Sequence, residues 1–172
     1  MPRFAAAIVW LAALNCSAAV AQTEPDLSRQ LAVLDRFVGT WDVTVTITRP
    51  KKLVVTYAEI VAWAPGRRWL RGDTGIKSDG TQDWSMTGFD QPSGGYHLWI
   101  FSSTGVWYYL APGKWDEARH SIEWKSPPFS PVSHLTHCTF TDARTRRCTS
   151  VVKDFKGSVV LEQEYTAKRR EP

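Results

Sequence analysis

The sequence predicts an all-β domain: a closed up-and-down antiparallel barrel of about ten strands, preceded by one short N-terminal helix. Three observations predict it. Hydrophobic and polar residues alternate through most of the chain, turn-forming residues recur at short intervals, and no helical segment separates consecutive strands. Antiparallel strands that meander leave an exposed edge unless the sheet closes. A barrel is therefore favoured, with a β-sandwich as the alternative.

Residues 1–21 have the pattern of a secretory signal peptide. A positive start is followed by an apolar run over residues 4–14, too short to span a bilayer, and by an A-x-A site at Ala19-Val20-Ala21. We expect cleavage after Ala21, which leaves residues 22–172 as a single domain, periplasmic or secreted and not transmembrane. A buried N-terminal helix and a lipoprotein anchor at Cys16 are the alternatives.

A helix and a run of strands account for the rest of the chain. Leu27, Leu31 and Leu34 recur at helical spacing, and Gly39 ends the helix. A first strand follows, in which Trp41 and every second residue to Ile47 form one apolar face. Further strands are expected at residues 53–63, 68–74, 84–90, 96–102, 106–111, 120–125, 132–140, 147–153 and 158–168. Pro112-Gly113 is expected to end the strand at 106–111.

Two cysteines remain once Cys16 leaves with the signal peptide. Cys138 and Cys148 flank a hairpin centred on Ala143, so a symmetric hairpin would place them opposite each other. In an oxidising compartment such a pair forms a disulfide. We therefore predict a Cys138–Cys148 bond, with two unpaired buried thiols as the alternative.

The junction between helix and first strand carries a resemblance. Gly39-Thr40-Trp41 looks like the GxW start of the calycin superfamily, which includes lipocalins, fatty-acid-binding proteins and nitrobindin-like haem binders. Pro65 to Leu70, Met86 to Asp90 and Gly113 to Asp116 are similar to a bacterial, often exported, lipocalin-like family of unknown function. The likeness covers roughly Leu31 to Lys168. It implies a calycin-like barrel.

The resemblance also implies a structural role for Trp41. In such barrels this tryptophan packs across one closed end, often beneath a cation from the final strand. Lys168 and Arg169 are the candidates for that cation here. A cation–π contact of this kind contributes about 0.5–2 kcal/mol.

The sequence holds no catalytic motif, so we expect a binding protein rather than an enzyme. A G-x-S-x-G elbow and a phosphate-cradling loop are absent. His134 and His137 lie on opposite faces of a strand, so we predict no metal site. One inward histidine (His97, His120 or His134) would suffice for haem, which stays a weaker alternative.

Basic clusters do not point to nucleic acid. Arg67-Arg68, Arg144 to Arg147 and Lys168 to Arg170 fall at turns or at the C-terminus, and the net charge is only +4. Nucleic-acid binding would need a continuous basic stripe interleaved with aromatic residues. We assign these clusters to solvated surface.

The aromatic residues carry the functional hypothesis. The chain has 9 Trp, and indoles in place of aliphatic core residues give a wide apolar lining with N–H donors. We expect a barrel that binds a small apolar or amphipathic ligand without transforming it, with Arg71 at the ligand's polar head. A barrel filled solid by its indoles, with a structural envelope role, is the alternative. The predicted lining residues are Trp69, Arg71, Trp99, Tyr109 and Trp124.

Overall fold

The computed structural model describes residues 27–171 as one closed antiparallel barrel with a single helix. The predicted signal peptide and its cleavage site after Ala21 lie outside the described residues. The elements are α1 (Leu27–Asp35), β1 (Gly39–Arg49), β2 (Leu53–Trp63), β3 (Trp69–Asp73), β4 (Asp83–Asp90), β5 (Gly95–Ser102), β6 (Trp107–Asp116), β7 (Ser121–Lys125), β8 (Ser133–Phe140), β9 (Thr145–Lys153) and β10 (Val159–Arg169).

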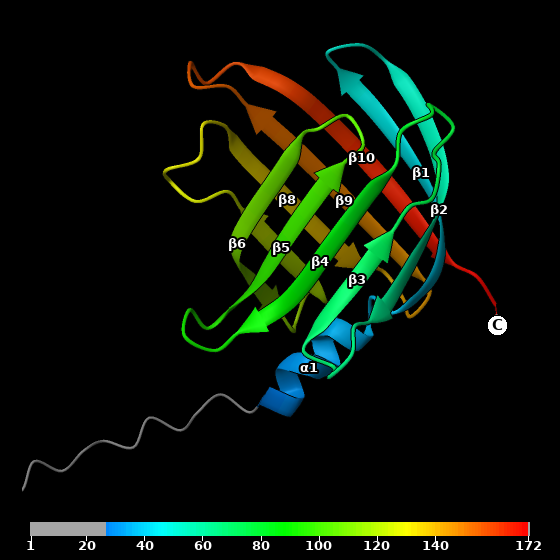
Figure 1. Ribbon diagram of the computed structural model, residues 1–172, viewed down its shortest axis with the longest axis vertical. Coiled ribbons are helices and arrows are strands. Elements are labelled where there is room, and N and C mark those ends of the chain that lie inside the picture. Colours follow the sequence, from blue (N-terminus) through cyan, green and yellow to red (C-terminus); the bar gives the residue numbers. More distant parts are fainter. Residues whose placement is uncertain (1–26, 172) are drawn as a thin grey trace, which may run out of the picture.

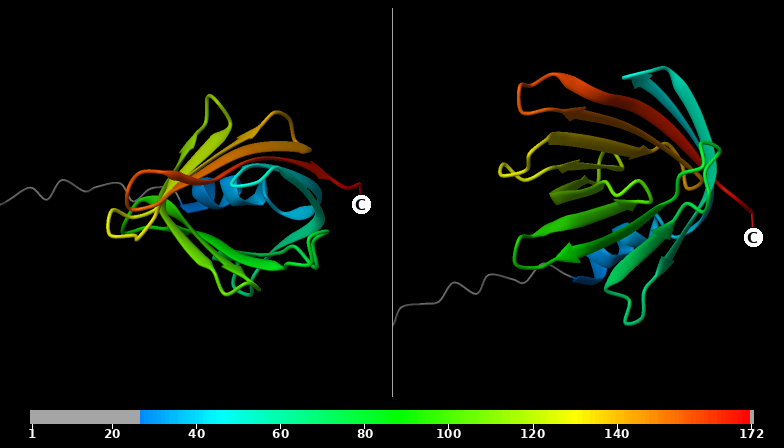
Figure 2. Two further views of the ribbon diagram at one scale, coloured as in Figure 1. Left: turned by 90° about the horizontal axis from the view of Figure 1, so that it is seen from above. Right: turned by 45° about the horizontal axis from the view of Figure 1, so that its top comes forward.

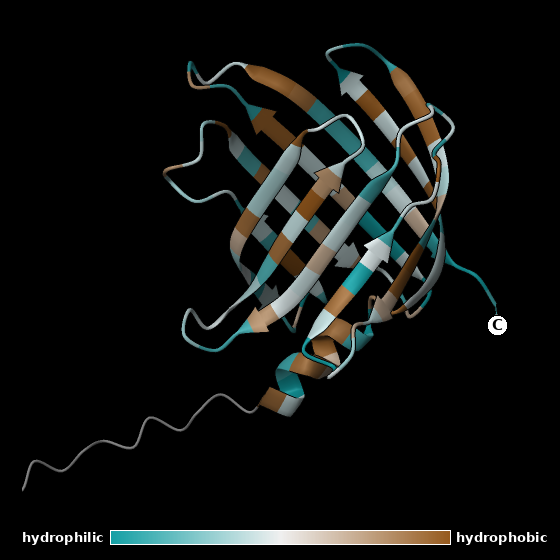
Figure 3. Ribbon diagram, in the orientation of Figure 1, coloured by the Kyte–Doolittle hydropathy of each residue, from teal (hydrophilic) through white to brown (hydrophobic). Residues whose placement is uncertain are grey.

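Each strand pairs with its neighbours in the chain, and β10 pairs with β1 to close the sheet. The closing pair runs from Trp41 opposite Arg169 to Arg49 opposite Glu162. Figure 1 shows the strands wrapped around a common interior, and Figure 3 shows hydrophobic and hydrophilic segments alternating along them. The closed topology confirms the predicted fold class. Closure pairs the backbone N–H and C=O groups that the edge strands of a sandwich would leave open.

The sixth strand is longer than predicted. β6 continues through Pro112-Gly113 to Asp116, whereas we expected these residues to end it. The register between β5 and β6 shifts between Tyr96 and Leu98, so that Ala111 and Pro112 form a bulge of β6 opposite His97. A bulge is one of the few places in a sheet where a proline costs no ladder hydrogen bond.

Helix α1 lies across one end of the barrel (Figures 1 and 2), which we name the closed end. Its buried Val33 and Leu34 pack into the core, and Tyr96 Oη donates a hydrogen bond of 2.7 Å to Gln30 Oε1 on the helix. The helix therefore serves as a fixed plug for this end.

Trp41 is the centre of the closed end. Its side chain is fully buried, and its Nε1 donates to the Phe37 carbonyl oxygen at 2.8 Å. Arg169, one of the two candidate cations, places Cζ 4.6 Å from the indole centroid and donates from Nη2 to the Arg36 carbonyl oxygen. Gly39 lies beside the Arg169 side chain with φ +138°, a conformation that favours glycine.

The opposite end, which we name the open end, is formed by five turns. They comprise residues 50–52, 74–82, 103–106, 126–132 and 154–158. No part of α1 reaches them, so within residues 27–171 the turns themselves cover this end (Figure 2).

The predicted disulfide is present between β8 and β9. Cys138 and Cys148 are directly paired in the register, and their sulfurs are bonded. Both side chains are buried in the barrel interior, where Cys138 Sγ lies 3.2 Å from Tyr165 Oη. The bond therefore joins two neighbouring strands inside the core.

Candidate functional site

A cavity of about 220 Å³ lies inside the barrel. Its wall is largely apolar and comes from inward residues of β1 to β5 and of β7 to β10. The aliphatic lining residues are Val45, Ile47, Val55, Val61, Leu70, Leu98 and Ile100. An apolar cavity with a small number of fixed polar groups is the usual form of a small-molecule site.

A buried ion pair lies at the closed-end side of the cavity. Arg146 Nη2 donates to Glu59 Oε2 at 2.6 Å across the barrel, from β9 to β2. The side chains of Arg146 and Glu59 are only 6% and 17% exposed, so the pair is shielded from water. The Arg146 Cζ atom also lies 5.1 Å from the Trp41 ring, which links the cavity floor to the closed end.

Two tyrosines flank this ion pair, Tyr57 of β2 and Tyr165 of β10, the two strands that pair with β1. Burial raises the pKa of Tyr165 to about 12, with Arg146 opposing the shift and Glu59 adding to it. Burial, with Glu59 next, likewise raises the pKa of Tyr57 well above its ordinary value. For Arg146, burial acts to lower the guanidinium pKa, but Glu59 and the two tyrosines outweigh it and the pKa is raised. At neutral pH the two tyrosines are therefore uncharged and Arg146 is charged. The floor carries one positive charge, on Arg146, and one negative charge, on Glu59.

A second ion pair lies at the mouth, on the open-end side. Lys77, from the turn between β3 and β4, bonds through Nζ to Asp83 Oδ2, and Nζ also lies 5.5 Å from the Tyr57 ring centroid. Both side chains are at most about one quarter exposed (13% and 26%). The mouth therefore carries this ion pair, and the Asp79 carboxylate of the same turn also lines the cavity.

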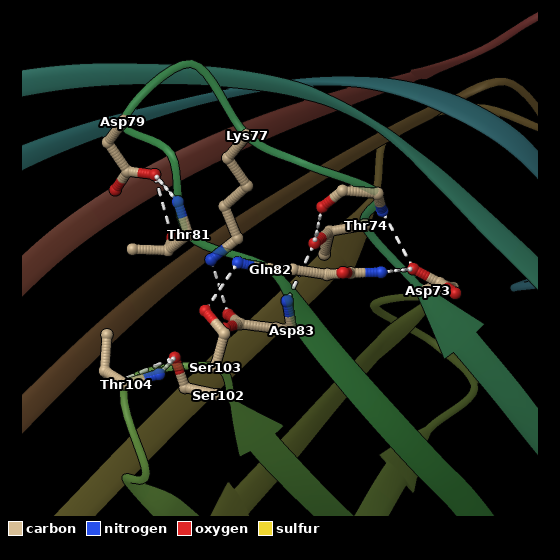
Figure 4. A network of polar contacts seen from close by, with 11 residues as sticks. Asp73, Thr74, Lys77, Asp79, Thr81, Gln82, Asp83, Ser102, Ser103 and Thr104 are labelled. Carbon is tan, nitrogen blue, oxygen red and sulfur yellow. Dashed lines mark hydrogen bonds and ion pairs between the residues drawn. The ribbon is translucent and has the colours of Figure 1, made fainter.

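The turn that carries Lys77 is anchored on both sides. Gln82 exchanges backbone and side-chain hydrogen bonds with Ser103 on the turn between β5 and β6 (Figure 4). On the other side, Ser78 N donates to the Thr56 carbonyl oxygen, and Thr56 N donates to Ser78 Oγ. The turn is thus held over the mouth as a fixed cover.

Three residues of the cavity lining each have a buried polar atom with no hydrogen-bond partner among the described residues. These atoms are Arg146 Nε, Trp124 Nε1 and Asp83 Oδ1. Arg146 Nε is a donor on the floor, and Asp83 Oδ1 is an acceptor at the mouth. Buried polar atoms normally find partners, so each has capacity for one that the protein itself does not supply.

Only one of the five predicted lining residues lines this cavity. Trp124 does so, with its indole packed against Gly113 of β6. Trp69, Trp99 and Tyr109 are outside the cavity lining, and Arg71 has a side chain 67% exposed. On β3, β5 and β6, the side chains that we predicted to point inward therefore point outward.

The inward positions of these strands belong to their sequence neighbours. Leu70 and Gly72 of β3 line the cavity, as do Leu98 and Ile100 of β5. Because successive strand side chains point to opposite faces, the residues between them point outward. Arg71 accordingly makes an exposed pair with Asp73 at 3.9 Å rather than meeting an interior ligand.

The outward aromatics form a cluster of their own on the barrel wall. Trp99 stacks on Tyr109 with ring centroids 4.9 Å apart, and Trp69 meets Trp99 edge-on at 5.3 Å. Trp69 lies directly over Gly88, where a Cβ would come within 2.2 Å of its ring. The indoles thus cover the sheet from outside.

His134 is the histidine that points into the barrel. Its Nε2 lies 2.7 Å from Ser150 Oγ and 3.0 Å from Thr136 Oγ1, and burial lowers its pKa to about 4. Neither it nor any other histidine lines the cavity, so the residues present offer no axial histidine to a haem bound there. His97 lies in the outer aromatic cluster, hydrogen bonded to Tyr109 and Ser93.

Among the described residues, no three His, Cys, Asp or Glu side chains gather as a metal site. No described helix is long and apolar enough to cross a membrane.

The most consequential correction concerns Arg146. We assigned it to a solvated basic cluster, but it is 5% exposed and forms the floor of the cavity. The signal that could have found it is the alternation of β9, in which Arg146 shares a face with Cys148 and Val152. Glu59 is likewise in phase with Val55 and Val61 of β2. A charged residue on each of two apolar faces predicts a pair, since buried charges need partners.

Comparisons with known proteins bear on the fold. No family model matches the sequence, and no curated protein does. Among solved structures, Rv2717c from M. tuberculosis is 14% identical with TM-score 0.65, and the match covers 85% of this chain and all (100%) of that one. A protein of unknown function from the DUF3598 family of Nostoc punctiforme is 9% identical with TM-score 0.52, covering 80% of this chain and 48% of that chain. This chain thus spans about half the length of the second protein. At these identities the likeness concerns the fold alone.

Proposed function

We propose that this protein binds a small, electrically neutral, amphipathic molecule inside the barrel, and that it carries the molecule without transforming it. One observation carries the proposal: a cavity with a largely apolar wall is lined by residues with buried unpaired polar atoms, the donors Arg146 Nε and Trp124 Nε1 and, at the mouth, the acceptor Asp83 Oδ1. A ligand with a hydrogen-bond acceptor at one end and a donor at the other would satisfy Arg146 on the floor and Asp83 at the mouth. Arg146 thus takes the role that the sequence had suggested for Arg71.

The charges of the site favour a neutral ligand over an acid. Arg146 is paired with Glu59 on the floor, Lys77 is paired with Asp83 at the mouth, and Asp79 also lines the cavity, so the lining carries two basic and three acidic side chains. A ligand carboxylate beside Arg146 would also lie near the Glu59 carboxylate. In a low-dielectric interior, that like-charge contact disfavours the anion.

The size of the cavity bounds the ligand. At about 220 Å³ it exceeds the roughly 150 Å³ cavity that holds benzene, and it is smaller than the roughly 300 Å³ at which drug-sized sites begin. A molecule of one or two fused rings, or a short branched chain, fits this range.

A matched set of two-ring probes tests the proposal by isothermal titration calorimetry. 2-Acetylnaphthalene carries a neutral carbonyl acceptor, 2-naphthoate carries a negative charge at the same place, and 2-ethylnaphthalene carries no polar group. We expect 2-acetylnaphthalene to bind about tenfold more tightly than 2-naphthoate and about threefold to tenfold more tightly than 2-ethylnaphthalene. Tighter binding of the naphthoate would contradict a neutral ligand.

Variants locate the binding inside the barrel. Ile100→Trp adds bulk to the cavity wall and should abolish binding of all three probes, while Arg71→Ala on the outer face should leave the affinities unchanged. The double variant Glu59→Gln/Arg146→Met removes the floor charges together and should erase the preference for the carbonyl probe. Equal affinities in the wild type and Ile100→Trp, with folding confirmed by circular dichroism, would reject an interior site.

We also propose that the protein works outside the cytoplasm, after loss of residues 1–21. The disulfide between Cys138 and Cys148 supports this, since such bonds persist in oxidising compartments. N-terminal sequencing of the protein from a periplasmic or culture-medium fraction tests it, and Gln22 is the expected first residue. Native mass spectrometry of the same sample would identify a co-purifying ligand.

A further inference from the structure

Three turns of the open end carry large apolar side chains at their tips. Ile76, Phe129 and Phe155 are 80%, 83% and 84% exposed, which makes them the most exposed large hydrophobic residues among residues 27–171. They come from the turns between β3 and β4, β7 and β8, and β9 and β10. These turns all leave the barrel at the same end (Figures 1 and 2). Scattered apolar residues need no explanation, but three such tips around one rim do.

The turns of the closed end differ in this respect. Residues 64–68, 91–94, 117–120 and 141–144 are made of polar, charged and small residues, and none carries a large aliphatic or aromatic side chain at its tip. The apolar tips are therefore specific to the rim around the cavity mouth.

Positive charge surrounds the same rim. Five exposed lysines lie on its turns or at the adjoining strand ends: Lys51, Lys52, Lys125, Lys153 and Lys156. Lys125 is paired with Glu123 at 2.9 Å, and the other four form no ion pair within residues 27–171. The turns themselves carry four lysines, counting Lys77, against two carboxylates: Asp79, which accepts from Thr81 N, and Asp154, which accepts from Lys156 N and Ser158 N. The rim thus combines exposed apolar side chains with an excess of lysine.

We infer that the open end docks on an anionic lipid bilayer, with Ile76, Phe129 and Phe155 inserted among the headgroups and the rim lysines against lipid phosphates. This pairing of apolar and basic residues is what an anionic interface selects. It disfavours a second copy of this chain as the occupant, because two such rims would oppose lysine to lysine. Docking in this orientation turns the cavity mouth toward the membrane. The inference stands whether or not the cavity ligand is the one proposed above.

Vesicle co-sedimentation of the protein, purified from cells that express the full chain, tests the inference. One vesicle is pure phosphatidylcholine, and the other is an equal mixture of phosphatidylcholine and phosphatidylglycerol. We expect binding to the anionic vesicles that weakens as salt is added, and at least about tenfold weaker binding to the neutral ones.

Two pairs of variants separate the apolar and the basic contributions. Phe129→Ser/Phe155→Ser should weaken binding to the anionic vesicles at least about tenfold, and the single outer-wall variant Ile60→Ser should not. Lys51→Gln/Lys156→Gln should weaken it about tenfold, whereas Lys114→Gln/Lys168→Gln, with the same change of charge away from the rim, should have no effect.

The opposite results would overturn the inference. These are no binding to either vesicle, equal loss in the rim and control variants, or binding that salt does not change. Light scattering gives the remaining outcome: if the wild type self-associates without lipid and Phe129→Ser/Phe155→Ser is monomeric, the rim is an interface between copies. Because the tips are exposed, these variants are expected to fold normally, which circular dichroism verifies.

Discussion

The closed end and the open end of this barrel use the same strands for opposite purposes. At the closed end, Trp41 is fully buried and two arginines, Arg146 and Arg169, lie over its ring. At the open end, Phe129 and Phe155 project into solvent with more than four fifths of their surface exposed. Aromatic side chains stabilise the fold at one end, and at the other they contribute surface that the fold does not need.

The largest expected difference between the ends is in stability. Trp41→Ala should lower the free energy of unfolding by about 4 kcal/mol, because it opens a cavity and removes the contacts with Arg146 and Arg169. Chemical denaturation measures it. Trp107→Ala is the matched control near the open end, since Trp107 is 64% exposed, and it should cost less than about 1 kcal/mol. Similar losses would remove the contrast between the ends.

The ion pair between the two ends is the next test. Glu59→Gln leaves the Arg146 charge buried without its carboxylate, which should cost about 3 kcal/mol of unfolding free energy. The control is Glu123→Gln, which breaks the exposed pair with Lys125 and should cost less than about 1 kcal/mol. A negligible loss for Glu59→Gln would mean that Arg146 is solvated.

Acid should act through His134. Burial lowers its pKa from 6.5 to about 4 in the folded protein, so between these values the unfolded chain binds the proton and the folded one does not. The wild type should therefore lose about 2–3 kcal/mol as the pH falls from 7 to 4, beyond the loss of His134→Gln over that range. Thermal unfolding at several pH values measures the difference. The comparison variant His137→Gln, on the opposite strand face, should keep the wild-type acid loss.

The smallest expected effect concerns the rim. Phe129→Ser/Phe155→Ser should change the free energy of unfolding by no more than about 0.5 kcal/mol, because neither side chain is buried in the fold. Denaturant midpoints with unchanged slopes would show it. A loss of several kcal/mol would place these residues in the core and remove them as a docking surface.

The strands and the disulfide were predictable because each depends on local pattern. Alternation in β1 placed Trp41 and Val43 on the buried face, and hairpin symmetry paired Cys138 with Cys148. The residues of the site were predicted poorly for a physical reason. In β3, β5 and β6, aromatic or aliphatic residues occupy both faces, as in Trp69-Leu70 and Leu98-Trp99, so alternation leaves the phase undecided.

The sequence by itself determined the all-β class, the ten strands, the short helix and the bond between Cys138 and Cys148, because these follow from residue spacing and turn chemistry. Only the tertiary structure decided which faces point inward and which distant charges meet. Arg146 and Glu59 are 87 residues apart, and only closure of the barrel brings them together across the interior. Their burial turns an arginine of a basic run into the floor of a cavity, because a charge shielded from water must be paired.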